Sequence, residues 1–294
     1  MVASHLMEFI IWGILAKARW LYSVRICHFL FMANHFHMLA VVDSPQDVSN
    51  FMSYIKGETA HAINILLGRK QKTVWQDGYD SPICLTAEDA EKRIRYIYEN
   101  PSRAGLVHSI EEYPGVSSWE MFSTNCLIKT CPRLPREQIP TLHSSALSIN
   151  EQKRYAAMFE KLDLEQHDFV LEPDAWRERF PIAASNEEII ADIKQSELER
   201  MKERKESGKD VIGATALRRE SMLKEHTPKK WSKRMICLCH DIELRKAFIE
   251  TFKHLAAQAA EAYRSWKSGD FSALIPPGMF CPRRPDMASA LSAI

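Results

Sequence analysis

Two histidines flank a single apolar residue in His35-Phe36-His37 and form a candidate metal-binding pair. Successive side chains of a β-strand point to opposite faces, so both imidazoles would project from one face and Phe36 from the other. Imidazole nitrogens are common ligands of divalent metal ions. Two half-buried structural histidines would give the same pattern, so the triplet alone leaves both interpretations open.

Tyr96 and Asn100 lie four residues apart and would share one face of a helix, whereas Tyr98 would project from another face. A tyrosine hydroxyl has a pKa of about 10 and is a poor nucleophile near neutral pH. It can attack a phosphodiester when a metal ion stabilises the charge on the phosphoryl oxygens, and the product is a covalent phosphotyrosine. The two histidines and the amide oxygen of Asn100 would complete an open three-ligand site. Taken by itself, Tyr96 is more simply interpreted as an aromatic residue at the edge of a core.

The apolar pattern predicts the elements that would carry these groups. The first four are a helix over 4–20, a strand over 23–32, a turn at Ala33-Asn34 and a strand from His35 to Val42. Ser44-Pro45 predicts the start of a helix that ends near Gly68. Residues 73–85 look extended, and Thr86 predicts the cap of a helix that ends at Pro101.

This order of elements indicates an α+β fold with the ferredoxin-like (RRM-like) alternation. We expect an antiparallel sheet with helices on one face, and no strand before the first helix. Residues 1–125 would form this catalytic domain, proline-containing residues 126–150 a linker, and 151–294 a mainly helical accessory region. Within that region, 186–206 predicts a charged, solvated helix and 241–268 an amphipathic helix.

The composition fits a folded chain of 294 residues, 46% of them hydrophobic. A net charge of +1 argues neither for nor against nucleic acid. The seven cysteines are irregularly spaced, unlike a secreted disulfide framework. The sequence has no apolar run of transmembrane length and no signal-peptide pattern, so we expect a cytoplasmic protein with no membrane partner.

Two segments carry a family resemblance. Residues 31–39, FMANHFHML, resemble the histidine motif of the single-tyrosine HUH transposases (transposase IS200-like domain). Residues 96–107, YIYENPSRAGLV, are similar to the tyrosine-helix signature of their REP-associated branch. Residues 75–79 and 113–119 also fall where that branch has similar stretches, so the resemblance spans roughly residues 8–120.

The resemblance implies a DNA transposase and single-strand nuclease acting on single-stranded hairpin DNA, from a REP-like or inverted-repeat element. It implies that His35, His37 and Asn100 bind Mg²⁺ or Mn²⁺ and that Tyr96 is the nucleophile. Cleavage would leave a 5′-phosphotyrosine and a free 3′-hydroxyl, and strand transfer would follow.

Two features depart from the family pattern. Family members begin with a strand that lies centrally in the sheet, whereas here the chain leads almost directly into the first helix, so the start is either misassigned or truncated. Without that strand the edge beside the histidine strand would be unpaired, and we expect lower stability and poorer metal geometry. Ala33 replaces the usual proline of the turn, and alanine can adopt the same conformation.

Basic residues near the tyrosine helix and in two other segments are candidate DNA contacts, because arginine and lysine suit phosphate. Arg93 flanks that helix as well and suits phosphate contact in the same way. The candidates are Arg69, Lys70, Lys72, Arg95, Arg103, Lys229 and Lys230. Solvated charge with no ligand is the alternative interpretation.

Two other functions remain open from the sequence. A chain that lacks the first strand could be a catalytically impaired DNA-binding remnant. An unrelated metal hydrolase could use the histidine pair to activate water and would form no covalent intermediate. The sequence does not distinguish a monomer from a dimer.

Overall fold

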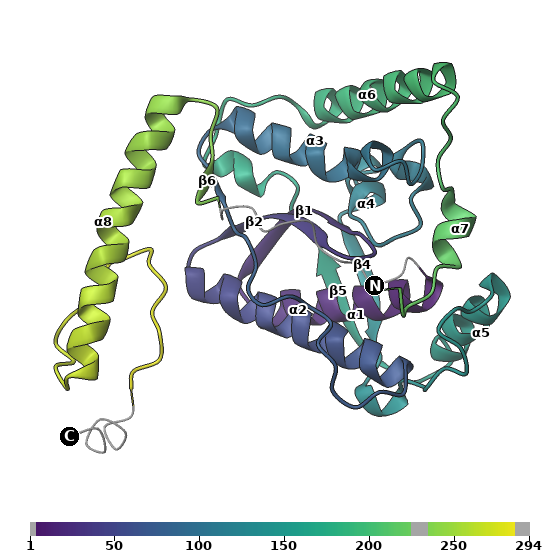
Figure 1. The fold of residues 1–294 in the computed structure, drawn as a ribbon, viewed down its shortest axis with the longest axis horizontal. Helices are drawn as coiled ribbons and strands as arrows, with labels where there is room; N and C mark the ends of the chain where they lie inside the picture. The colour runs from purple at the N-terminus through teal and green to yellow at the C-terminus, as the bar shows by residue number, and fades with distance from the viewer. Residues whose placement is uncertain (1–3, 225–234, 286–294) are drawn as a thin grey trace.

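The computed structural model describes residues 4–224 and 235–285 (Figure 1). Its helices and strands are, in chain order, α1 (His5–Leu21), β1 (Val24–Phe31), β2 (Phe36–Val42), α2 (Pro45–Leu66), β3 (Ile83–Cys84), α3 (Ala87–Arg103), α4 (Trp119–Ser123), β4 (Ile128–Arg133), α5 (Ile149–Phe159), β5 (Glu165–Val170), α6 (Asn186–Glu206), α7 (Ala214–Arg218), β6 (Cys237–Leu238) and α8 (Ile242–Lys267). The predicted N-terminal helix, hairpin and second helix are confirmed. Side chains of Ser4, Ser44 and Thr86 cap α1, α2 and α3 by accepting backbone N–H groups.

The β1–β2 hairpin lies between two helical layers (Figure 1). Helices α1 and α2 lie on one side of the hairpin, whereas α3 lies on the other side with α6 outside it. The α+β class is therefore confirmed, but the expectation that helices cover only one face is wrong. The reason is that seven of the eight residues of β1 are buried, so both faces of this strand need cover.

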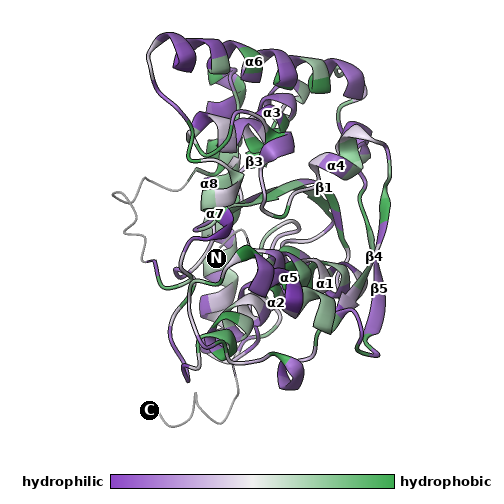
Figure 2. Cartoon of the chain, turned by 90° about the vertical axis from the view of Figure 1, so that its right-hand side faces the viewer, coloured by the Kyte–Doolittle hydropathy of each residue, from purple (hydrophilic) through white to green (hydrophobic). Residues whose placement is uncertain are grey.

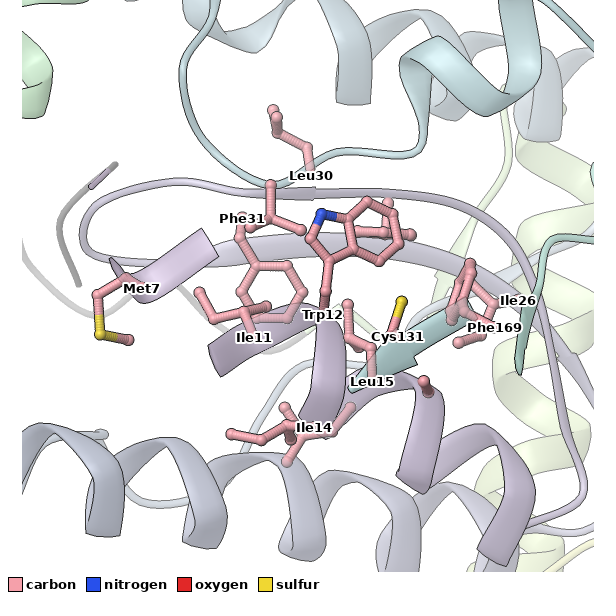
Figure 3. Packing of buried hydrophobic residues seen from close by; sticks show 14 of the residues in the cluster. Met7, Ile11, Trp12, Ile14, Leu15, Ile26, Leu30, Phe31, Cys131 and Phe169 are labelled. Carbon is pink, nitrogen blue, oxygen red and sulfur yellow. The ribbon is translucent and has the colours of Figure 1, made fainter. Parts of the chain in front are cut away.

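Neighbouring side chains of β1 show how the two faces are filled. His28 points toward α3, and its ring centroid lies 5.6 Å from that of Tyr98. Phe29 points the other way, with its centroid 5.5 Å from Trp12 of α1 and 5.6 Å from Phe169 of β5. Figure 3 shows Trp12 among other buried apolar side chains, including that of Phe169. One strand thus joins the helix that carries Tyr96 to the main apolar core.

Residues 126–150 are part of the folded core, and the prediction of a linker there is wrong. This segment contains β4, which pairs antiparallel with β5. Its buried apolar side chains are those of Cys131, Leu134, Ile139, Leu142 and Leu147. The β4–β5 strand pair packs on α1, where a Cβ on Gly13 would lie 2.3 Å from the carbonyl oxygen of Pro132. Glycine is required here because any side chain would force the helix away from the strand.

The strands form three two-stranded sheets in the described residues, in place of one ferredoxin-like sheet. Within that described part, β2 has ladder pairing only with β1, so its outer edge carries no strand. The other edge of β1 is partly covered, since Phe31 donates to the Val116 carbonyl and Glu172 donates to the Ile26 carbonyl. Only Ile83–Cys84 of the extended segment 73–85 is a strand, and it pairs with β6.

Helix α6 packs along α3, although its sequence predicts a solvated helix. Its outer face is largely hydrophilic (Figure 2), but Ile189 and Ile193 are fully buried against the body. Ion pairs complete the contact: Arg95 Nη2 lies 2.8 Å from an oxygen of Asp192, and Arg200 Nη2 lies 2.6 Å from an oxygen of Glu99. Charged residues that suggested solvent exposure therefore bind the neighbouring helix.

Glu197 of α6 predicts a measurable pH effect on stability. Burial raises the pKa of this carboxyl to about 7, against the opposing effect of a hydrogen bond from the Ile110 amide. The folded protein keeps a proton that the unfolded chain loses, so this group lowers stability as pH rises from 4.5 to about 7. We expect Glu197→Gln to raise the free energy of unfolding by ~1–3 kcal/mol at pH 8 and by almost nothing at pH 4.5.

Urea unfolding at the two pH values measures this difference. Glu203→Gln on the same helix is the matched control, since Glu203 is exposed and its substitution should change stability by less than ~0.5 kcal/mol. An equal gain for Glu197→Gln at both pH values would contradict the titration of Glu197 as its cause.

Candidate active site

The turn between β1 and β2 positions His35, the first histidine of the pair. The Met32 amide donates to the His35 carbonyl at 2.8 Å and closes the turn. Asn34 Oδ1 lies 2.7 Å from His35 Nδ1, and because an amide oxygen only accepts hydrogen bonds, Nδ1 is the donor and the lone pair of this imidazole is on Nε2. A ligating histidine is commonly oriented in this way by a hydrogen bond to its other nitrogen.

His37 lies beside His35, as the strand pattern predicts. The two ring centroids are 4.8 Å apart with the ring planes at 79°. Burial, with contributions from the nearby His35 and Arg93, lowers the pKa of His37 to about 3. The imidazole is therefore neutral near pH 7 and keeps a lone pair for a metal ion. Its Nε2 is buried without a hydrogen-bond partner among the described residues.

Tyr96 of α3 faces this pair. Its ring centroid lies 5.2 Å from that of His37, and the residue is 36% exposed. Tyr98 is fully buried on another face of the helix, as predicted, with its hydroxyl 2.9 Å from His28 Nδ1 and 2.8 Å from Ser118 Oγ. These buried hydrogen bonds fix the rotation of α3, and that rotation directs Tyr96 toward the histidines.

Asn100 follows Tyr96 by one helical turn. The helix does not end at Pro101 as predicted, because the Asn100 carbonyl accepts the Ala104 amide at 2.9 Å and the helix runs on to Arg103. Asn100 Nδ2 is buried and has no hydrogen-bond partner among the described residues. The side-chain amide thus has hydrogen-bonding capacity that the surrounding protein does not use.

These residues fit a divalent metal ion. His37 keeps a buried Nε2 without a hydrogen-bond partner among the described residues, and His35 is oriented by Asn34. The unpartnered Nδ2 of Asn100 is a donor, so this residue would bind a metal ion only through its Oδ1. In the part of the chain that the structure describes, no group of three or more histidine, cysteine, aspartate and glutamate side chains could hold a metal. The candidate donors are therefore two imidazoles and one amide, a set that leaves positions open for a substrate.

Two arginines of α3 lie against the ring of Tyr96. The Cζ atom of Arg93 is 5.0 Å from the ring centroid, and that of Arg103 is 5.7 Å from it. Arg103 is a predicted DNA contact, and the sequence places Arg93 among the arginines beside this helix that suit phosphate contact. Its spacing of three residues before Tyr96 is the signal that could have selected it.

Among the described residues, no other predicted DNA contact interacts with Tyr96. Arg95 pairs with Asp192 of α6. The loop that holds Arg69, Lys70 and Lys72 follows α2, and Asn64 binds the Arg69 side chain and the Lys72 carbonyl. Lys229 and Lys230 lie outside the described residues. DNA contact by these residues remains a prediction.

A strand-borne histidine pair facing a helix tyrosine is the arrangement that the resemblance to single-tyrosine HUH transposases leads us to expect. Comparison with family models agrees: residues 3–100, about a third of the 294-residue chain, match the family described as transposase IS200-like. This part of the chain is similar to the IS200-like transposases, a family whose partner is DNA.

The remaining comparisons add no relatives. Neither the curated proteins nor the solved structures contain a match to this chain. Among the residues that the structure describes, no helix combines the length and the apolar character needed to cross a membrane.

Proposed function

We propose that the protein is a metal-dependent transposase or single-strand nuclease that cleaves and rejoins hairpin DNA through a 5′-phosphotyrosine. The position of Tyr96 carries the proposal, because its ring lies 5.2 Å from that of His37 on a different element. The IS200-like match supports DNA as the substrate. A REP-like or inverted-repeat hairpin is the substrate we infer, since residues 96–107 resemble the REP-associated branch.

In the proposed reaction Tyr96 Oη attacks the phosphorus of a phosphodiester, and the bond from phosphorus to the 3′ oxygen breaks. The phenol loses its proton to solvent, and the departing 3′ oxygen takes up a proton. The products are a strand joined through its 5′-phosphate to Tyr96 and a strand with a free 3′-hydroxyl. Rejoining reverses these steps, because a 3′-hydroxyl attacks the phosphotyrosine and releases Tyr96.

The protein side chains have separate roles in this proposal. His35, His37 and Asn100 would hold Mg²⁺ or Mn²⁺, which when bound would stabilise charge on the phosphoryl oxygens. The buried contacts of Tyr98 hold α3 so that the Tyr96 hydroxyl meets the bound phosphate. Orienting the nucleophile in this way lowers the entropic cost of the attack.

Metal removal tests the proposal on the full chain. We expect a labelled single-stranded hairpin oligonucleotide to form a covalent adduct with Mn²⁺ or Mg²⁺, and EDTA to abolish the adduct, because the metal stabilises the developing charge. His37→Gln should lower the adduct rate by on the order of 10²-fold or more, since a buried ligand is lost. Adduct is measured as a labelled band that survives denaturing electrophoresis.

The alternatives give different results in the same assay. Binding of the oligonucleotide without cleavage would support the DNA-binding remnant, which the bare outer edge of β2 in the described residues favours. Cleavage without an adduct would support a metal hydrolase. His61→Gln is a matched control, because His61 is an exposed histidine of α2 and its loss should leave the adduct rate unchanged.

A further inference from the structure

The two arginines beside Tyr96 come from one helix and approach the same ring. Arg93 precedes Tyr96 by three residues and Arg103 follows it by seven, so helical geometry places all three on one face of α3. Their guanidinium carbons lie 5.0 and 5.7 Å from the ring centroid. The phenol is thus bracketed by two cations on the side of the helix that faces the histidines.

The carboxylate of Glu99 lies between Arg103 and an arginine of a second helix. Its Nη1 lies 3.6 Å from Glu99 Oε2, but the same oxygen lies only 2.6 Å from Arg200 Nη2 of α6. Arg200 also donates to the Ser102 hydroxyl at 2.8 Å. Glu99 is buried, and the closer Arg200 compensates most of its negative charge. The positive charge of Arg103 beside Tyr96 is therefore only partly compensated.

Arg93 has no ion pair with any carboxylate in the described part of the chain, unlike Arg95, which pairs with Asp192. A half-exposed arginine that contacts an aromatic ring keeps its planar set of N–H donors available for an anion. The cation–π contact holds the guanidinium in place without neutralising it. An anion bound to the Arg93 guanidinium would lie beside the ring of Tyr96.

We propose that Arg93 and Arg103 form a clamp for the phosphodiester that Tyr96 attacks. The clamp binds the non-bridging oxygens of that phosphate, and Arg200 of α6 maintains it by neutralising Glu99. The inference rests on the proposed function, which it deepens by assigning the substrate-binding residues. It also gives the C-terminal half of the chain a role, since α6 supplies Arg200 and thereby sets the charge around the nucleophile.

The chemical reason for such a clamp is that negative charge shifts among the phosphoryl oxygens during transfer. Guanidinium groups that already lie beside those oxygens stabilise the transition state, in which the charge develops, more than they stabilise the ground state. Two arginines on the tyrosine helix also fix the distance between phosphorus and nucleophile, since phosphate and phenol are then held by the same rigid element.

The test compares Arg93→Gln with Lys92→Gln, which removes one charge from the adjacent position of the same helix. Lys92 is exposed and pairs with Glu88, away from Tyr96. At saturating oligonucleotide and Mn²⁺, Arg93→Gln should form adduct on the order of 10²-fold more slowly than wild type, and Lys92→Gln within about 3-fold of it. Arg93→Lys should recover part of the rate, because it restores charge without the planar donors.

A binding measurement separates the clamp from the chemistry. Oligonucleotide affinity is measured against salt concentration in a Tyr96→Phe background. Arg93→Gln should reduce the slope of log K against log salt by about 0.7, the value for one lost phosphate contact on a single strand. Lys92→Gln should leave the slope unchanged, and equal melting temperatures for the two variants would show that both are folded.

The outcomes decide the proposal in either direction. A slower adduct and a reduced slope for Arg93→Gln alone would support the clamp. An unchanged slope would overturn it, even with a slower reaction, because Arg93 would then act without touching phosphate. If the wild-type protein bound the oligonucleotide but formed no adduct, the proposed function would fail, and the salt slope alone would decide whether the clamp exists.

Discussion

Phenylalanine in place of Tyr96 should abolish the covalent DNA adduct. The substitution removes one oxygen from a ring that is 36% exposed, so we expect the fold, and the contact of the ring with His37, to be kept. The loss should be on the order of 10⁴-fold or more in adduct rate, since no other group replaces a covalent nucleophile. The measurement is the labelled band under denaturing conditions, with mass spectrometry of wild-type adduct to identify the modified peptide.

Tyr98→Phe is the matched control for this experiment. Tyr98 lies two residues away on the same helix but is fully buried, and its hydroxyl bonds His28 and Ser118. Its loss leaves two buried polar groups without their partner, which should lower the free energy of unfolding by ~1–3 kcal/mol. Adduct should still form, because the nucleophile remains, but more slowly than in wild type, because α3 is held less firmly. An adduct that persisted in Tyr96→Phe and disappeared in Tyr98→Phe would reverse the two assignments.

The candidate site could be predicted because its spacings are local. An alternating strand dictates that His35 and His37 share a face, and a helical turn dictates the same for Tyr96 and Asn100. The sequence does not give the rotation of the helix against its neighbours. That rotation decides which side of α3 meets α6, so the sequence does not show that Arg95 pairs with Asp192, whereas the three-residue spacing of Arg93 from Tyr96 is local.

The strand β4 escaped prediction for a different physical reason. It is short, it contains Pro132, and its partner β5 lies more than 30 residues later in the chain. A proline cannot donate to a ladder, so its presence argues for an edge strand or a loop. What makes the segment a strand is tertiary packing on α1 at Gly13, which no local pattern contains.

The largest loss of stability should come from Trp12→Ala. Trp12 of α1 is buried, with its ring centroid 5.5 Å from Phe29 of β1 and 5.4 Å from Phe169 of β5. Its side chain therefore joins the hairpin that carries the histidines to the β4–β5 strand pair. Removal leaves a cavity between three elements, and we expect the free energy of unfolding to fall by ~3–5 kcal/mol in urea titrations.

Trp20→Ala in the same helix is the control, because Trp20 is 67% exposed and contacts mainly Lys17 and His167. Its loss should cost less than ~1 kcal/mol. The free energy of unfolding of a domain is roughly 5–15 kcal/mol, so Trp12→Ala would remove a large part of it. Equal effects of the two substitutions would mean that the packing of Trp12 on β1 and β5 does not stabilise the fold. A large effect of Trp12→Ala alone would show that the core formed by α1, β1 and β5 supports the fold of the candidate site.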